Sequence, residues 1–351
     1  MKVIYFILFY LFTNINFEVY AYYNKNDTEQ NKVVLNNKKS IIFKNNFKNI
    51  KINAISPASS IETDKYSELK KLNSFLLLPE KMYENKIPYH SSNDKTRFNE
   101  LKEAIYNDNK IIWTLRGGYG SARLYEKLEQ LKKPEVDKIF IGYSDVTFLH
   151  LFFTQKWNWI TIHGSTLSDL LDNDKDINNF NLIYEILNNN QNTISYKNIE
   201  AVNDIAKNSI EISGISTGGN LEIITNSIGT SWEIQTKNKI IFLEETNLKG
   251  YSLDRSLNHL IQANLLKDAK AIIFGDLLGS DENIEIALKR FSTEINVPVF
   301  KLNTFGHGSK NYPIILNTMT TVQLKNNRII FNYNQNYFKS NSKMGQYAIK
   351  D

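Results

Sequence analysis

The chain has 351 residues and a formal net charge of +5, and 42% of its residues are hydrophobic, enough for one large core or two modest ones. The absence of cysteine excludes disulfides, thiolate metal ligands, a thiol nucleophile and a lipid-modified N-terminal cysteine. Most of the excess charge lies in residues 22–50, where six lysines stand against Asp27 and Glu29, so the rest is nearly neutral and gives no indication of nucleic-acid binding.

The first 21 residues have the pattern of a secretory signal peptide. Lys2 precedes an unbroken apolar run over residues 3–12, which is too short to span a membrane. Val19 and Ala21 provide the aliphatic and small side chains that signal peptidase prefers before a cleavage site after Ala21. We therefore expect an exported, periplasmic protein with no membrane span after cleavage. An anchor that is not cleaved is the alternative.

The next part of the chain predicts a basic arm and then an α/β domain. Residues 22–47 are rich in Asn and Lys and lack periodicity, so we expect a flexible arm there. Between residues 48 and 188, strands and helices alternate, as in a mostly parallel sheet with helices on both faces. The expected strands are residues 50–55, 110–115, 138–142 and 159–162, and the expected helices are residues 61–72, 94–106, 122–131 and 146–154.

The pattern changes after about residue 190. The Asn-rich residues 189–208 predict a linker, residues 209–335 a β-rich C-terminal domain, and residues 336–351 a polar tail. In the C-terminal domain we expect strands at residues 210–212, 239–243, 271–274, 297–302, 321–324 and 328–332.

Ser144 stands where an expected strand ends and a helix begins. A sharp turn there would lift the hydroxyl out of the sheet and aim the first helical N–H groups at the same point. The local sequence Gly142-Tyr143-Ser144-Asp145 resembles a nucleophile elbow but lacks its second glycine. A helix N-cap at Ser144 or Asp145 is the competing interpretation.

A glycine-rich loop, Arg116-Gly117-Gly118-Tyr119-Gly120, follows the strand expected at residues 110–115. Its exposed N–H groups could complete an oxyanion hole. A tight turn that needs glycine at positive φ would explain the same residues. The spacing does not match a dinucleotide-binding loop.

Two histidines are candidates for a catalytic base. His307 lies between Gly306 and Gly308 after an expected strand, and the two glycines would let its imidazole project into a cleft. His163 also follows a strand, so the pattern favours His307 without excluding His163. His150 and His259 lie in apolar or helical patterns that predict structural roles.

Two carboxylates, Glu244 and Glu245, end the strand expected at residues 239–243. A carboxylate at that position could orient an imidazole. Solvation, or an ion pair with a base such as Arg255, is the alternative. No group of His, Asp and Glu has metal-ligand spacing, so we expect no metal and no other cofactor.

Taken in order, these motifs resemble the LD-carboxypeptidase family, the murein tetrapeptide carboxypeptidases, which also contains microcin-immunity peptidases. The resemblance covers about residues 50–325, and the glycine loop together with residues 142–145 is its most specific part. The matching segments are residues 52–59, 97–101, 115–124, 142–147, 163–164, 218–221, 243–245, 254–257 and 305–307.

The resemblance implies a serine peptidase with a Ser–His–Glu triad, in which Ser144 is the nucleophile, Glu244 the carboxylate and His307 the base. It also implies an α/β domain that carries the serine, a β-rich domain that carries the acid and the base, and a homodimer. Glu245 and Asn317 depart from the family's usual Asp and Gly, and neither is part of the implied triad.

The activity implied is hydrolysis of the L-D amide bond that releases the terminal D-Ala of a murein tetrapeptide, so peptidoglycan-derived peptides are the expected ligands. The oxyanion would be bound by the backbone N–H of Asp145 and of Gly117 or Gly118. An exopeptidase must also bind the free D-Ala carboxylate, for which arginine is well suited. The candidates for substrate contacts are Arg116, Arg123 and Arg255, with Tyr119 and Asn220.

Two other functions remain open on the sequence. A microcin-immunity peptidase would act on a peptidyl-nucleotide toxin in the cytoplasm, and the signal peptide counts against it. A non-catalytic module that binds peptidoglycan is the other, and the presence of all three triad residues counts against it.

The signal peptide predicts that the exported protein begins at Tyr22. N-terminal sequencing of the exported protein would check this. Recovery of the full-length chain from the membrane fraction would instead favour an uncleaved anchor.

Overall fold

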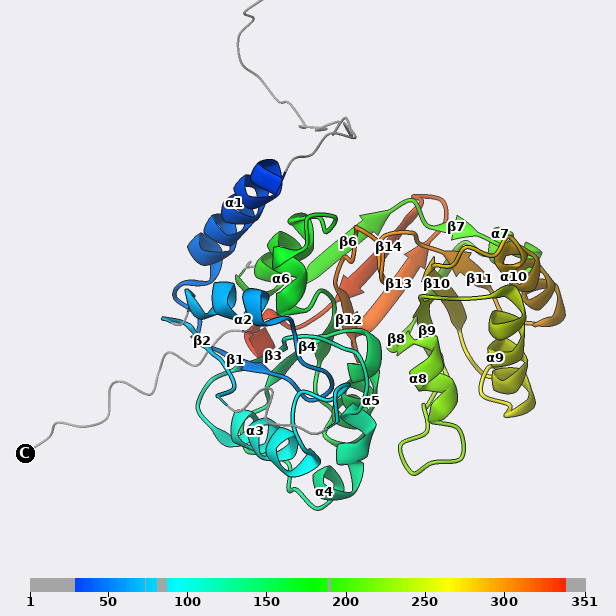
Figure 1. Cartoon of the computed structure of the whole chain (residues 1–351). Helices are drawn as coiled ribbons and strands as arrows, with labels where there is room; N and C mark the ends of the chain where they lie inside the picture. Colours follow the sequence, from blue (N-terminus) through cyan, green and yellow to red (C-terminus); the bar gives the residue numbers. More distant parts are fainter. Residues whose placement is uncertain (1–28, 73, 81–86, 189–190, 339–351) are drawn as a thin grey trace, which may run out of the picture.

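A computed structural model describes residues 29–72, 74–80, 87–188 and 191–338, which form two sheets with flanking helices (Figure 1). The expected signal peptide, residues 1–21, and residues 339–351 of the expected tail lie outside the described residues. Within the described ranges, no helix is both long and apolar enough to cross a membrane.

The first sheet has six strands in the order β12-β5-β4-β3-β1-β2, and all neighbours are parallel except β12, which runs antiparallel to β5. Every residue of β1, β3, β4 and β5 is buried, as expected for parallel strands covered on both faces. The strands are β1 (Ile52–Ile55), β2 (Leu76–Leu77), β3 (Ile111–Thr114), β4 (Ile139–Gly142), β5 (Thr161–His163) and β12 (Ile314–Leu316).

The connections of this sheet contain α-helices and short 3-10 helices. They are α2 (Thr63–Lys70), α3 (Asp94–Tyr106), η1 (Ser121–Leu124), α4 (Tyr125–Glu129), η2 (Ser144–Val146), α5 (Thr147–Lys156), η3 (Leu167–Leu171) and α6 (Asn178–Asn188).

The second sheet has eight strands in the order β6-β14-β13-β8-β9-β10-β11-β7. Its centre, β8 to β11, is parallel, and the strands outside it are antiparallel to their neighbours. The strands are β6 (Thr193–Lys197), β7 (Glu200–Ala201), β8 (Glu211–Asn220), β9 (Lys239–Glu245), β10 (Ala271–Leu277), β11 (Val299–Lys301), β13 (Met319–Gln323) and β14 (Arg328–Asn332). The helices are α7 (Asp204–Lys207), α8 (Leu221–Asn226), α9 (Gly250–Gln262), α10 (Asn283–Glu294) and α11 (Gln335–Phe338).

The expected fold class is confirmed: a mostly parallel α/β sheet is followed by a second domain built on a larger sheet. The expected boundaries need two changes. Residues 189–208 are not a plain linker, because they contain both edge strands of the second sheet, β6 and β7, and the helix α7. In addition, β12 comes from the C-terminal part of the chain but completes the first sheet.

The prediction of a flexible arm over residues 22–47 is wrong for residues 29–47, which form the helix α1 (Glu29–Phe47). Phe43 and Phe47 lie four residues apart, on one helix face, and both are fully buried. Their rings pack against Trp113 of β3 at 5.8 and 5.5 Å between centroids. Among the side chains of α1 that the structure describes, residues 38–47, Phe43 and Phe47 are the fully buried apolar ones, and the Asn and Lys residues around them hide the periodicity in the sequence.

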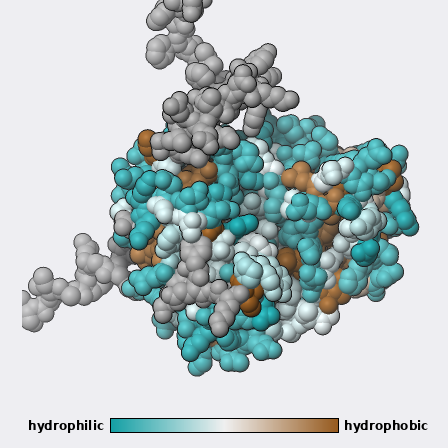
Figure 2. Space-filling view, viewed as in Figure 1, coloured by the Kyte–Doolittle hydropathy of each residue, from teal (hydrophilic) through white to brown (hydrophobic). Residues whose placement is uncertain are grey.

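The two sheets share their cores. Successive strand residues point to opposite faces, so Ile112 and Trp113 of β3 belong to different apolar clusters, as do Ile241 and Phe242 of β9. Each cluster contains residues of both sheets, so the domains are packed as one body. The outer surface in the view of Figure 2 is mostly hydrophilic, with small separate apolar patches.

The burial of α1 predicts a measurable role in stability. Phe43→Ala should lower the free energy of unfolding by about 3–5 kcal/mol, because it leaves a cavity against Trp113 and Phe180. Ile41→Ala is the control, since Ile41 is 60% exposed on the same helix, and it should change stability by less than about 0.5 kcal/mol. Denaturant unfolding would measure the two changes in the free energy of unfolding. Equal changes in Phe43→Ala and Ile41→Ala would mean that α1 does not pack against the sheet.

Candidate active site

Ser144 occupies a strained turn at the end of β4. Its φ is +67°, a left-handed conformation that is uncommon outside glycine, and it is the first residue of η2. Gly142 precedes the turn, and a Cβ there would lie 2.3 Å from Thr114 Oγ1, so only glycine fits. This strand–turn–helix geometry is that of a nucleophile elbow, even though the second glycine of the usual motif is missing.

The glycine loop at residues 116–120 lies directly against this turn. A Cβ on Gly117 would lie 2.8 Å from Ser144 Cβ, so a larger residue would displace the serine. The buried Asp145 carboxylate accepts hydrogen bonds from the N–H groups of Gly120 (3.2 Å) and Ser121 (2.9 Å). Burial raises the pKa of Asp145, against the effect of these hydrogen bonds. Asp145 therefore holds the loop beside Ser144 with its side chain, a role that the sequence did not predict.

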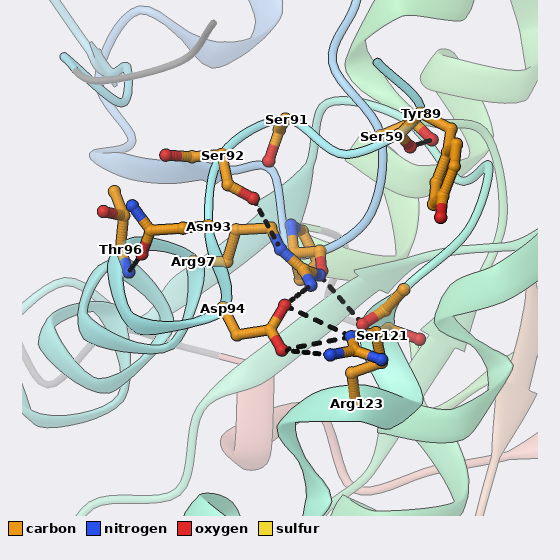
Figure 3. Close-up of polar contacts among 12 residues, drawn as sticks. Ser59, Tyr89, Ser91, Ser92, Asn93, Asp94, Thr96, Arg97, Ser121 and Arg123 are labelled. Atoms are coloured by element: carbon orange, nitrogen blue, oxygen red, sulfur yellow. Dashed lines mark hydrogen bonds and ion pairs between the residues drawn. The ribbon is translucent and has the colours of Figure 1, made fainter. Parts of the chain in front are cut away.

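Arg97 of α3 also contacts this loop, and Figure 3 shows its side chain between Ser92 and Asp94. Its guanidinium is fully buried and donates to the carbonyls of Pro57, Gly120 and Ser92, the last two at 2.8 and 3.2 Å. The Asp94 carboxylate forms an ion pair with this guanidinium, with Oδ1 at 2.6 Å from Nη2. Sequence reasoning gave Arg97 no role, although an arginine four residues before Leu101 on the apolar face of a helix was the available signal.

Glu244 and His307 form a buried pair. Glu244 is fully buried near the end of β9, and its Oε2 lies 2.6 Å from Nδ1 of His307 in the loop between β11 and β12. Burial by itself would raise the pKa of Glu244, but His307 and then His163 outweigh it and lower the pKa to about 2. Burial would lower the pKa of His307, but the Glu244 carboxylate outweighs it and raises the pKa above its usual value.

The imidazole of His307 is oriented toward an open cavity. Tyr143 packs on it with 4.8 Å between ring centroids, and Nδ1 is engaged by Glu244. Among the described residues, His307 Nε2 makes no hydrogen bond, and neither does Ser144 Oγ. Both side chains line the same cavity.

Glu245 shares Asn220 as a neighbour with Glu244, but its other partners are different. Its carboxylate accepts hydrogen bonds from Asn220 Nδ2 and from the N–H groups of Glu222 and Thr246, all at 2.8–2.9 Å. It thus supports the start of α8 rather than the histidine. The neighbouring acids therefore differ in what they touch, and Glu244 is the one paired with His307.

The other candidate histidine, His163, lies behind Glu244. Its Nε2 is 3.7 Å from Glu244 Oε1, which is too long for a hydrogen bond, and neither ring nitrogen has a hydrogen-bond partner within the described part of the chain. His163 is buried and does not line the cavity. His150 is also buried and bonds Thr161 and the carbonyl of Gly142, and burial lowers its pKa to about 3.

The cavity has a volume of about 510 Å³ and is strongly polar. It is lined by Glu62, Lys65, Arg116, Gly117, Gly118, Tyr143, Ser144, Asp145, Thr166, Ser168, Asp169, Asp172, Asn220, Glu222, Ile223, Glu245, Thr246, Asn247 and His307.

The structure separates the substrate-binding candidates into two groups. Arg116 and Asn220 line the cavity, whereas Tyr119, Arg123 and Arg255 do not. Tyr119 stacks on His90, Arg123 pairs with Asp94 at 2.8 Å, and Arg255 lies over the ring of Tyr251.

Lys65 of α2 is a cation of the cavity wall that the sequence analysis missed. It is paired with Asp172 at 2.7 Å and with Glu62 at 3.4 Å. A lysine in a helix with many polar residues looks like any surface lysine, so the sequence does not indicate that Lys65 lines the cavity.

Two family models match the chain in the order of its domains. Residues 52–164 match the LD-carboxypeptidase N-terminal domain, and residues 213–322 match the LD-carboxypeptidase C-terminal domain. A two-domain carboxypeptidase fold with a strained serine facing a His–Glu pair is thus the class that fold and site define. The chain belongs to the LD-carboxypeptidase family.

Individual relatives agree with this assignment. A Rickettsia conorii protein named "Putative carboxypeptidase" is 45% identical over 278 residues, which cover 78% of this chain and 88% of the relative. A muramoyltetrapeptide carboxypeptidase from Oxalobacter formigenes has a similar fold, with a TM-score of 0.66 and 22% identity over 80% of this chain and 97% of that one. The microcin C7 self-immunity protein has a TM-score of 0.69 and 20% identity, covering 82% of this chain and 96% of that one.

Proposed function

We propose that the protein is a serine carboxypeptidase that hydrolyses the L-D amide bond before the terminal D-Ala of murein tetrapeptides. The observation that carries the proposal is the buried Glu244–His307 pair, which faces the same cavity as Ser144 in its strained turn. Membership of a carboxypeptidase family and a relative's name that includes muramoyltetrapeptide support the reaction and the substrate class.

The proposed mechanism uses the two nitrogens of His307 separately. Nδ1–H donates to Glu244 and fixes the tautomer, so that Nε2 is the atom that takes the Ser144 proton. Ser144 Oγ attacks the carbonyl carbon of the residue before D-Ala and forms a tetrahedral intermediate. His307 then gives the proton to the amine of D-Ala as the bond breaks, and water hydrolyses the acyl-enzyme by the same route.

The oxyanion of this intermediate would be bound by backbone N–H groups of Asp145 and of Gly117 or Gly118. The glycine loop is held against the turn by Asp145 and Arg97, so these donors are in place before substrate arrives. Such preorganisation is valuable because the donors do not have to reorient as charge develops; one such donor is typically worth ~10²–10³ in rate.

Arg116 is the proposed partner of the free D-Ala carboxylate. It is one of two cations of the cavity wall besides His307, and its pair with Glu62 is loose, at 3.7 Å. Lys65, the other, is held closely by Asp172. The acidic side chains of the wall would suit the free amine of a diaminopimelate residue.

We also propose export as the location, on the basis of residues 1–21, and a homodimer, on the basis of family resemblance. Export favours a peptidoglycan substrate over a cytoplasmic toxin. Peptidyl-nucleotide hydrolysis is the second candidate, because the microcin C7 self-immunity protein shares the fold.

The test is a digest of purified muropeptides followed by mass spectrometry, with peptidyl-adenylate substrates assayed in parallel. We expect tetrapeptides to lose a single D-Ala, Ser144→Ala to be inactive, and EDTA to have no effect. Cleavage of adenylates alone would move the assignment to a microcin-immunity peptidase. Undiminished activity in Ser144→Ala would overturn the serine mechanism, and binding without turnover in the wild type would favour a non-catalytic module.

The two neighbouring glutamates should respond differently to mutation. Glu244→Gln should lower kcat by several orders of magnitude, since loss of a triad carboxylate typically costs about 10⁴-fold. Glu245→Gln should cost far less, because Glu245 contacts Asn220 and the start of α8 instead of His307. Steady-state kinetics of the two matched variants would decide, and the reverse ranking would make Glu245 the triad acid.

The pH dependence follows from the raised pKa of His307. The imidazolium form cannot accept the Ser144 proton, so kcat/KM should fall as the pH is lowered through an apparent pKa that is higher than that of an ordinary histidine. In Glu244→Gln, the residual activity should show this acidic limb of the pH–rate profile at lower pH, because the Glu244 carboxylate is what raises the pKa of His307. A pH–rate profile measures both, and an acidic limb that stays in place in Glu244→Gln would contradict the pairing.

A further inference from the structure

The helix α1 reaches the segment between η3 and α6. The ammonium of Lys39, on α1, donates to the backbone carbonyls of Asp172 (2.7 Å) and Lys175 (2.6 Å). Lys65 of α2 fixes the same segment through the Asp172 carboxylate at 2.7 Å. Residues 172–175 are thus held by lysines from two helices, although the segment has no regular structure of its own.

The same segment also forms hydrogen bonds with the loop that carries His307. The ammonium of Lys175 donates to the carbonyls of His307 (2.7 Å) and Gly308 (2.8 Å). The next residue, Asp176, donates its N–H to the carbonyl of Ser309 at 3.0 Å. On the other side of the loop, Asp276 of β10 accepts the N–H of Gly308 at 2.8 Å.

We propose that Lys175 is a positioning residue for His307, and that α1, through Lys39, holds Lys175 in place. The Glu244 carboxylate orients the imidazole ring, whereas Lys175 fixes the backbone from which that ring projects. The backbone needs such support because His307 stands between two glycines and Gly306 has a φ of +121°. The inference rests on the proposed function only in that His307 is taken as the base.

The contacts of α1 divide into two kinds, which makes the proposal separable from a general effect on stability. Phe43 and Phe47 bury apolar surface, whereas Lys39 is only half-buried and makes polar contacts with carbonyls. Loss of Lys39 should therefore disturb the histidine more than the fold. Both family-domain matches leave out α1 and the Lys175 segment, since they cover residues 52–164 and 213–322.

The experiment compares Lys175→Met, Lys175→Arg, Lys39→Met and the double variant Lys39→Met/Lys175→Met in the full chain. The controls are Lys44→Met, at an exposed lysine of α1, and Lys310→Met, at an exposed lysine three residues after His307 in the same loop. In the described residues, neither control side chain makes a hydrogen bond. Three quantities are measured: kcat and KM on a murein tetrapeptide, the rate at which a fluorophosphonate labels Ser144, and the melting temperature.

We expect Lys175→Met to lower kcat by at least about tenfold and Lys39→Met by roughly three- to tenfold, with KM within about twofold, because a displaced base affects the chemical step more than binding. Lys175→Arg should recover most of kcat, since a guanidinium can also donate to two carbonyls. The double variant should lose little more than Lys175→Met, because both lysines act through one segment. The two controls should match the wild type.

The labelling rate separates this inference from the proposed function. If wild-type Ser144 is labelled but no tetrapeptide is cleaved, the proposed substrate is wrong, and the order of labelling rates among the variants still tests Lys175. If Ser144 is not labelled at all, the serine mechanism itself fails. Unchanged kcat and labelling in Lys175→Met, or losses that follow melting temperature alone and are not recovered by arginine, would overturn the positioning role.

Discussion

The buried Glu244 carboxylate is the constraint on which the site depends. A carboxylate without exposure to water is costly unless it is paired and hydrogen-bonded, and removal of one partner from such a pair typically costs ~3–5 kcal/mol. His307 lies at 2.6 Å through Nδ1 and is the main partner of this carboxylate, and Asn220 adds a longer hydrogen bond at 3.4 Å. The Glu244–His307 pair raises the pKa of His307 and, together with His163, lowers the pKa of Glu244. The site is therefore set electrostatically before any substrate binds.

The fold explains how residues far apart in sequence meet there. Ser144 follows β4 of the first sheet and Glu244 lies near the end of β9 of the second, so the two sheets must keep a fixed position relative to each other. Two apolar clusters, each with residues of both sheets, hold the sheets in this position. The strand β12 adds to this, because it belongs to the C-terminal part of the chain but pairs with β5 of the first sheet. If the two domains were joined only by a hinge, the distance between Ser144 and His307 could vary. Shared cores prevent this.

Sequence patterns predicted the elements whose apolar runs are long or whose motifs are specific. The strands at β1, β3, β4, β9, β10 and β14 and the helix α3 were placed within a few residues, and the expected triad residues came from ordered motifs. The sequence did not predict α1 or β6, because a few buried side chains there stand among Asn and Lys. It also missed Lys175, since its partners are backbone carbonyls from a distant segment, which leave no trace in local spacing, and it missed Arg97, whose place on the apolar face of α3 indicates burial but not its partners.

The charges of the cavity bear on which substrate it suits. Its wall carries six acidic side chains against two basic ones besides His307. A nucleotide phosphate would have to approach these carboxylates with few cations to compensate, and like charges brought together are unfavourable. A tetrapeptide end that carries a free amine beside its carboxylate offers both signs of charge. This charge balance supports the proposed zwitterionic peptide end over a phosphate-bearing ligand, with Arg116 as the proposed partner of the carboxylate and Glu222 as the proposed partner of the amine.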